Sequence, residues 1–227
     1  MPSLPQAQPL NQWFPDLVAP CQSVYGPIRD YRAQLLPGEQ AAVARAVPNR
    51  QHEFASGRLF ARLAMGALGV RDQPVLAGAH REPLWPAEIV GAISHSKGEA
   101  WAAVARRDQG VQGVGIDLEH LGRLQPQLYE RLFTAAECRH IEREGPALAT
   151  SLFSAKEAVY KAVFPHGQRF IGFQEVELIL DLGGGTDARP FRARYLGSHE
   201  PNRIMEAGLG HVRLCDPLVF TVFVLAG

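Results

Sequence analysis

The stretch Gly113-Val-Gly-Ile-Asp-Leu-Glu119 does most to define the fold and chemistry of this 227-residue chain. Its apolar residues alternate with Gly115, Asp117 and Glu119, and a period of two is typical of a β-strand. The alternation places both carboxylates on one face, about 7 Å apart. The glycines leave that face open to a cation such as Mg²⁺, which prefers carboxylates and phosphate oxygens. An ordinary strand with a solvated acidic face fits the same pattern.

Further strand-like runs lie on both sides of this stretch. The runs at 89–94, 100–106 and 111–119 are separated only by short turn sequences, so we expect them to form neighbouring strands. The other runs are at 22–28, 175–180, 190–196, 211–214 and 218–225. Gly183-Gly184-Gly185 indicates a turn between two of the later runs.

Helical segments precede each group of strands. Pro37 opens a short helix, and a longer helix is expected at 50–68. Thr134-Ala-Ala-Glu137 has the form of a capping box, and Pro146 opens a helix that reaches about Phe164.

The order of helices followed by strands therefore occurs twice. It predicts an α+β protein built as a pseudo-two-fold pair of similar lobes. We expect an N-terminal lobe at residues 1–112 and a C-terminal lobe at 113–227, with the ligand site between them.

A second block, Phe153-Ser-Ala-Lys-Glu-Ala-Val-Tyr-Lys161, carries ionisable residues at helical spacing. Glu157 and Lys161 lie four residues apart and project from the face opposite an apolar stripe. Taken alone, they are better explained as a surface ion pair that contributes about 0.3 kcal/mol.

Candidate anion ligands lie in the first half of the chain. Ser94 and His95 follow an apolar run and precede a turn, where ligand contacts accumulate. A histidine that merely ends a strand is the commoner case. Arginine binds phosphate bidentately, and the candidates on the long helix and in the loop after it are Arg50, Arg58, Arg62 and Arg81. Singly, each of these is more often a solvated surface side chain.

The composition is that of a soluble globular protein, with 46% hydrophobic residues and a net charge of zero from 23 basic and 23 acidic residues. This balance argues against a broad nucleic-acid surface. The three cysteines have no metal-binding or disulfide-scaffold spacing. Neither a signal peptide nor a membrane-spanning run is expected, so we place the chain in the cytoplasm.

Together, four blocks resemble the signatures of the 4'-phosphopantetheinyl transferase superfamily, and the match spans roughly residues 48–165. The similarity is greater to its monomeric, two-lobed branch, the surfactin-synthetase-activating and enterobactin synthetase component D type. The blocks are Arg81-Glu-Pro-Leu-Trp-Pro86, Ile93-Ser-His-Ser96, Gly115-Ile-Asp-Leu-Glu119 and Phe153-Ser-Ala-Lys-Glu-Ala-Val-Tyr-Lys161.

The resemblance implies transfer of the 4'-phosphopantetheine arm of coenzyme A to a serine of an apo carrier protein, with release of 3',5'-ADP. The implied ligands of Mg²⁺, or of Mn²⁺, are Asp117, Glu119 and Glu157. The implied catalytic residues are Glu157, Lys161 and Asp117. Lys161 would contact the reacting phosphate, and Glu157, or a water that it orients, would be the general base. The implied coenzyme A ligands are Arg50, Arg58, Arg62, Arg81, Ser94, His95 and Lys161.

The implied partners are carrier proteins or carrier domains of nonribosomal peptide, polyketide or fatty-acid synthases, and a siderophore pathway is one setting. The segment 121–145 is our candidate docking surface for them. The resemblance also implies a monomer. Two other functions use the same residues: a Mg²⁺-dependent phosphohydrolase and a nucleotide-binding module without catalysis.

Overall fold

The computed structural model describes residues 4–180 and 188–227. It confirms the α+β class: the chain combines helices with antiparallel sheet pairs. Its contacts divide it into two compact units, Met1–Val111 and Gln112–Gly227, which we describe separately. The two-lobed catalytic unit, with its boundary after residue 112, stays a prediction. The turn predicted at Gly183-Gly184-Gly185 lies outside the described residues.

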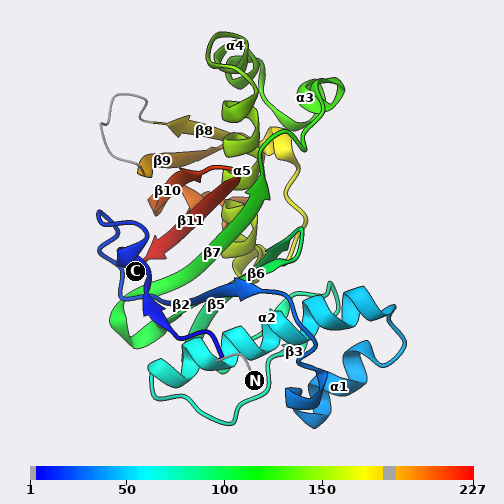
Figure 1. Cartoon of the computed structure of the whole chain (residues 1–227). Coiled ribbons are helices and arrows are strands. Elements are labelled where there is room, and N and C mark those ends of the chain that lie inside the picture. The colour runs from blue at the N-terminus through cyan, green and yellow to red at the C-terminus, as the bar shows by residue number, and fades with distance from the viewer. Residues whose placement is uncertain (1–3, 181–187) are drawn as a thin grey trace. The chain divides into compact units, whose positions relative to one another are not determined.

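The first unit packs a long helix on a four-stranded sheet (Figure 1). The sheet has the order β1-β2-β6-β5 and is antiparallel throughout. Its strands are β1 (Gln8–Pro9), β2 (Gln22–Pro27), β5 (Ile89–Ser96) and β6 (Glu99–Arg106). The helices are α1 (Pro37–Val43) and α2 (Pro48–Ala67). A small hairpin joins β3 (Leu76–Ala77) and β4 (Pro83–Leu84), and short 3₁₀ turns are η1 (Leu10–Gln12), η2 (Arg32–Gln34) and η3 (Arg107–Gln109).

Helix α2 begins at Pro48, two residues before the predicted start, because proline fits the first helical position. It ends before Gly69, whose φ of 82° is a conformation that favours glycine. Its apolar face, with Phe60 and Met65, is completely buried in the core of this unit. The helix therefore holds its polar residues at fixed positions relative to β5 and β6.

The second unit contains a five-stranded sheet with the order β7-β11-β10-β9-β8. The strands are β7 (Val111–His120), β8 (Val176–Leu180), β9 (Ala188–Tyr195), β10 (Gly208–Cys215) and β11 (Leu218–Ala226). The helices are α3 (Tyr129–Leu132), α4 (Ala135–Glu144) and α5 (Pro146–Gly167). The 3₁₀ turns are η4 (Pro126–Leu128), η5 (Phe173–Glu175) and η6 (Glu200–Ala207). Helix α5 runs along this sheet (Figure 1).

The expectation that three consecutive runs form neighbouring strands was wrong for the third. β5 and β6 pair as predicted, but β7 lies beside β11 in the second sheet. Gly110, with a φ of 77°, ends the turn before β7. The strand then packs on α5. Its partner strand β11 follows only about a hundred residues later in the chain, so spacing along the sequence could not reveal the pairing.

The capping box at the start of α4 is confirmed. The Thr134 hydroxyl accepts a hydrogen bond from the Glu137 amide at 3.3 Å, and the Thr134 amide donates to the Glu137 carboxylate at 2.8 Å. Helix α5 continues past its predicted end at Phe164 to Gly167, with Pro165 inside its last turn. Within the described part of the chain, no helix has both the length and the hydropathy needed to cross a membrane.

Candidate functional site

The site in the second unit begins with a close contact between β7 and α5. A methyl group added to Gly115 would lie 1.8 Å from the carbonyl oxygen of Ala158, and one added to Gly113 would lie 2.7 Å from that of Ala162. The glycines therefore make room for the helix backbone. Our expectation that they leave space for a ligand was wrong, because α5 fills that face of the strand.

The contact brings Lys161 of α5 onto Asp117 of β7. The Lys161 ammonium lies 2.7 Å from Asp117 Oδ1 and donates to the carbonyl of Ile116 at 3.1 Å. Asp117 is only 4% exposed. Lys161 thus pairs with a buried carboxylate 44 residues away in sequence, which excludes the interpretation as a simple surface pair with Glu157.

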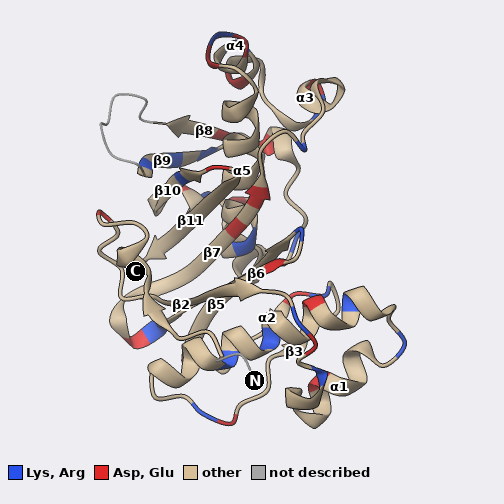
Figure 2. Cartoon of the chain, viewed as in Figure 1, with Lys and Arg blue, Asp and Glu red and all other residues tan. Residues whose placement is uncertain are grey.

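Two further carboxylates, Glu119 of β7 and Glu157 of α5, lie close enough to Asp117 to feel its charge. Figure 2 shows acidic positions as red bands on β7. Burial raises the pKa of Glu119, and the nearby charge of Asp117 raises it further. Burial also raises the pKa of Glu157, with Lys161 opposing the shift and Asp117 adding to it. Burial, more than repulsion from Asp117, thus disfavours the ionised form of both glutamates.

This charge distribution fits a hard divalent cation, because carboxylate oxygens are the ligands that Mg²⁺ prefers. A bound cation would favour the ionised form of both glutamates and so oppose the effect of burial, which raises their pKa values. In the part of the chain that the structure describes, no three acidic, histidine or cysteine side chains converge into a finished metal cluster. The residues at the junction therefore suit Mg²⁺ in the type of their donor atoms and in their charge.

A cavity of about 160 Å³ lies beside Glu119 in the same unit. Its lining consists of Glu119, Arg123, Leu124, Thr150 and Phe153. Arg123 lies 3.5 Å from the Glu119 carboxylate and is about half exposed, so this ion pair is weak and easily exchanged. The acidic site is thus open to solvent on the Glu119 side.

The first unit brings together two of the predicted phosphate ligands, Arg50 and His95. Arg50 Nη1 lies 2.9 Å from His95 Nε2 and 3.0 Å from the Glu53 carboxylate. Because arginine can only donate, His95 Nε2 accepts in this contact. Arg50 and His95 are both exposed enough to meet a ligand, so they form a small polar site of their own.

Two other predicted ligands have contacts inside the first unit. Arg58 is 6% exposed, donates to the carbonyls of Val75 at 2.7 Å and Leu76 at 3.4 Å, and stacks on Phe54. Burial lowers the pKa of Arg58 to about 10. Arg62 binds the fully buried carboxylate of Glu39. Both guanidinium groups are thus already held by the protein.

Ser94 and Arg81 are the two remaining predicted phosphate ligands. Ser94 is buried in β5, next to His95 in sequence. Arg81 lies in the loop between β3 and β4, with a φ of 68° and its amide bonded to the carbonyl of Gly78. The roles predicted for these two residues stay predictions.

Sequence reasoning missed three acidic or basic residues that contact the predicted ones. Glu53 follows Arg50 by three positions on α2, a helical spacing that could have revealed the pair. Arg123 follows Glu119 by four positions. Glu39, the buried partner of Arg62 and of the Val75 amide, gave no local signal because its partners lie 23 and 36 residues away.

Comparison with known proteins covers both units. Residues 38–105 match the family model of the 4'-phosphopantetheinyl transferase N-terminal domain, and residues 113–205 match that of the 4'-phosphopantetheinyl transferase superfamily. The 4'-phosphopantetheinyl transferase PptT of Mycobacterium tuberculosis is 37% identical over 164 residues, 71% of this chain and 70% of the relative. Svp of Streptomyces mobaraensis, another 4'-phosphopantetheinyl transferase, is 40% identical over 167 residues, 71% and 66%.

Enterobactin synthase component D of Escherichia coli is 34% identical over 144 residues, which cover 61% of this chain and 66% of the relative. Among solved structures, the holo-(acyl-carrier-protein) synthase of Thermotoga maritima aligns with a TM-score of 0.40 and 20% identity. That alignment covers 51% of this chain and 64% of that one.

Proposed function

Because the chain belongs to the 4'-phosphopantetheinyl transferase superfamily, we propose that the junction of β7 and α5 is its phosphoryl-transfer centre. The chain is a transferase of this class: it moves the 4'-phosphopantetheine arm of coenzyme A to a serine of an apo carrier protein. The observation that carries the proposed site is the Lys161 ammonium, 2.7 Å from Asp117, beside two carboxylates whose pKa values are raised.

In the reaction, the serine oxygen forms a bond to the β-phosphorus of coenzyme A while the bond to the bridging oxygen breaks, which releases 3',5'-ADP. Glu157, or a water that it orients, accepts the serine proton. Its raised pKa makes it a stronger proton acceptor than an ordinary carboxylate. The Lys161 ammonium stabilises the charge that develops on the phosphate.

We propose Asp117, Glu119 and Glu157 as the residues that hold Mg²⁺. When bound, the ion would neutralise charge on the pyrophosphate as a Lewis acid. In the first unit, Arg50 and His95 are the proposed ligands of the nucleotide phosphates. Ser94 and Arg81 belong to the same proposed set. Arg58 and Arg62 complete the proposed set, although their own contacts already give them a structural role.

The proposed partners are carrier domains of nonribosomal peptide, polyketide or fatty-acid synthases, and segment 121–145 is their proposed docking surface. The relative named enterobactin synthase component D supports a setting in siderophore biosynthesis. A cytoplasmic monomer is the proposed state of the chain. The phosphohydrolase and the non-catalytic module are not favoured, because the related proteins are transferases.

Chromatography of the nucleotide products tests this proposal. With coenzyme A, Mg²⁺ and an apo carrier protein, we expect 3',5'-ADP to accumulate in proportion to carrier consumed. Without carrier, no nucleotide product should form. A hydrolase would release product without any carrier, and a binding module would release none under either condition; both results would contradict the proposal.

A further inference from the structure

Lys156 is a buried cation next to the proposed base Glu157, and the proposed reaction does not use it. Its side chain is 1% exposed. The ammonium lies 2.7 Å from the Glu137 carboxylate and donates to the carbonyls of Leu132 at 3.0 Å and Phe173 at 2.8 Å. An ammonium has three donors, so each of them has a partner here.

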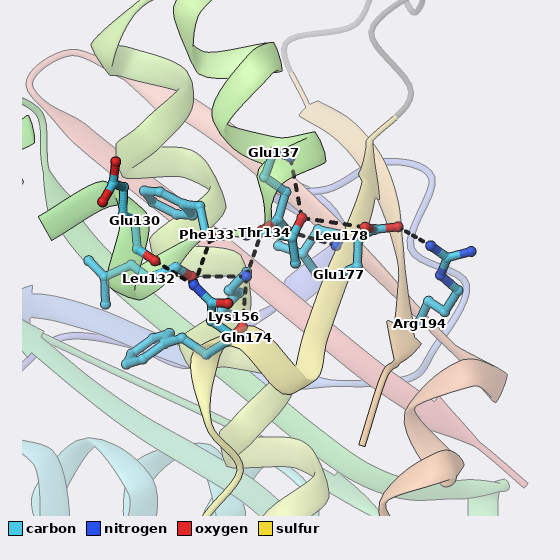
Figure 3. Close-up of polar contacts among 11 residues, drawn as sticks. Glu130, Leu132, Phe133, Thr134, Glu137, Lys156, Gln174, Glu177, Leu178 and Arg194 are labelled. Carbon is cyan, nitrogen blue, oxygen red and sulfur yellow. Dashed lines mark hydrogen bonds and ion pairs between the residues drawn. The ribbon is translucent and has the colours of Figure 1, made fainter. Parts of the chain in front are cut away.

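These partners come from three different elements around α5 (Figure 3). Leu132 ends α3, Glu137 lies in the first turn of α4, and Phe173 begins η5. Glu137 extends the connection, since its second carboxylate oxygen accepts the Leu178 amide of β8 at 2.9 Å. One side chain of α5 is thus fixed to much of the second unit.

Glu137 is itself built into the fold and cannot easily turn away. It is 3% exposed, and it accepts the Thr134 amide through the capping box as well as the Lys156 ammonium. A buried carboxylate with these fixed donors is a rigid anchor. Lys156 therefore has one position in which its charge is paired.

The side of α5 that faces β7 is held by the Lys161–Asp117 pair, which lies five residues farther along the helix. There the helix backbone lies against Gly113 and Gly115, which have no side chains to interlock with it. The glycine contacts set how close the helix comes but do little to fix its rotation about its own axis, so this rotation depends on the charged pairs made by Lys161 and Lys156. Consecutive helical residues point about 100° apart, so an error in the rotation at one residue passes in full to the next.

We propose that Lys156 is a positioning residue for phosphopantetheinyl transfer. Through its ion pair with Glu137 it fixes the rotation of α5. That rotation directs Glu157 and Lys161 toward the acidic end of β7. This role rests on the proposed function of the site, because the readout is the Mg²⁺ requirement of the transfer reaction.

The test compares the wild-type chain with the double variant Lys156→Met/Glu137→Gln. Methionine keeps an unbranched side chain, and the single oxygen of glutamine can still accept the Thr134 amide of the capping box, so no unpaired charge stays buried. Transfer to an apo carrier is followed by mass spectrometry as a function of Mg²⁺ concentration, below the melting temperature of every variant. We expect the Mg²⁺ midpoint of the double variant to rise by about tenfold or more, as for other residues that orient metal ligands.

Phe191→Leu is the matched control, because it opens space in the core of the same unit on β9, where Phe191 stacks on Phe223. It should lower the melting temperature and leave the Mg²⁺ midpoint unchanged. If the double variant does not fold, Lys156→Arg replaces it: the charge stays but the ammonium geometry is lost, so a smaller shift in the same direction is expected.

Each outcome has one meaning. A folded double variant, or failing that Lys156→Arg, with the wild-type Mg²⁺ midpoint would overturn the positioning role and leave the proposed function intact. A wild-type chain whose transfer does not depend on a divalent cation would overturn the proposed metal site instead. Equal midpoint shifts in the double variant and in Phe191→Leu would also overturn the positioning role, because the effect would follow stability alone.

Discussion

The arginines of α2 differ in what their guanidinium groups contact, and this difference predicts separate effects of mutation. Arg50 is exposed beside His95, so Arg50→Gln should raise KM for coenzyme A about tenfold or more, the effect of one lost charged hydrogen bond. Its melting temperature should not change. Arg58→Gln should instead lower stability by roughly 1–3 kcal/mol, because the carbonyls of Val75 and Leu76 lose a buried donor.

Steady-state kinetics and thermal unfolding of both variants separate these roles. An unchanged KM in Arg50→Gln would remove that residue from the ligand set. An Arg58→Gln variant with wild-type stability would show that the buried contacts of Arg58 contribute little to the free energy of unfolding.

The raised pKa of Glu157 predicts how the stability of the chain depends on pH. Burial raises its pKa in the folded chain, so the group adds stability at low pH that is lost as the pH rises through the folded-state value. In buffer without divalent cations, Glu157→Gln should therefore have a higher melting temperature than the wild type near neutral pH. The difference in melting temperature should shrink toward about pH 4. A gain of each kcal/mol corresponds to roughly 2–4 °C for a chain of this size.

Thermal unfolding across this pH range, with a chelator present, measures the effect. Glu144→Gln, at an exposed position in α4, is the matched control and should follow the wild type at each pH. A difference between Glu157→Gln and the wild type that does not vary with pH would contradict the assigned cause.

At the scale of elements, the contact between β7 and α5 depends on the absence of a side chain at Gly115. Gly115→Ala would place a methyl group 1.8 Å from a backbone oxygen that cannot move without the helix. We expect a loss of about 3 kcal/mol or more in stability, together with loss of transfer. Gly66→Ala is the control: a methyl group there meets nothing within 4 Å, and alanine stabilises a helix by about 1 kcal/mol.

Thermal unfolding of both glycine variants decides the matter. A Gly115→Ala chain as stable as the wild type would show that the helix can move away from β7 at little cost. The close contact of α5 with β7 would then not be what positions Lys161 against Asp117.

The elements also show what the sequence could and could not predict. The longer strands and helices were predicted to within about three residues at each end, because periodicity and capping residues such as Thr134 and Pro146 act locally. The short elements β1, β3, β4 and α3 were not predicted. The pairing of β7 with β11 and the role of Gly115 were not found, because both depend on segments distant in sequence.

The site itself was only partly predictable for the same reason. The spacing of the motifs identified Asp117 and Lys161 as candidates. It could not predict that the two side chains contact each other, because they are 44 residues apart in sequence. The pairing of Glu39 with Arg62 and that of Lys156 with Glu137 have no local sequence pattern, because the partners are distant in sequence and meet only when the unit folds.

For the whole molecule, the central claim is that this chain transfers phosphopantetheine with the help of a divalent cation at Asp117. The most direct measurement is the intact mass of an apo carrier protein after incubation with coenzyme A and the chain. We predict that the carrier gains the mass of one phosphopantetheine group when Mg²⁺ is present. The gain should be lost with a chelator or in Asp117→Asn. A set of apo carriers from fatty-acid, polyketide and nonribosomal peptide synthases that gains no mass with any divalent cation would contradict the account.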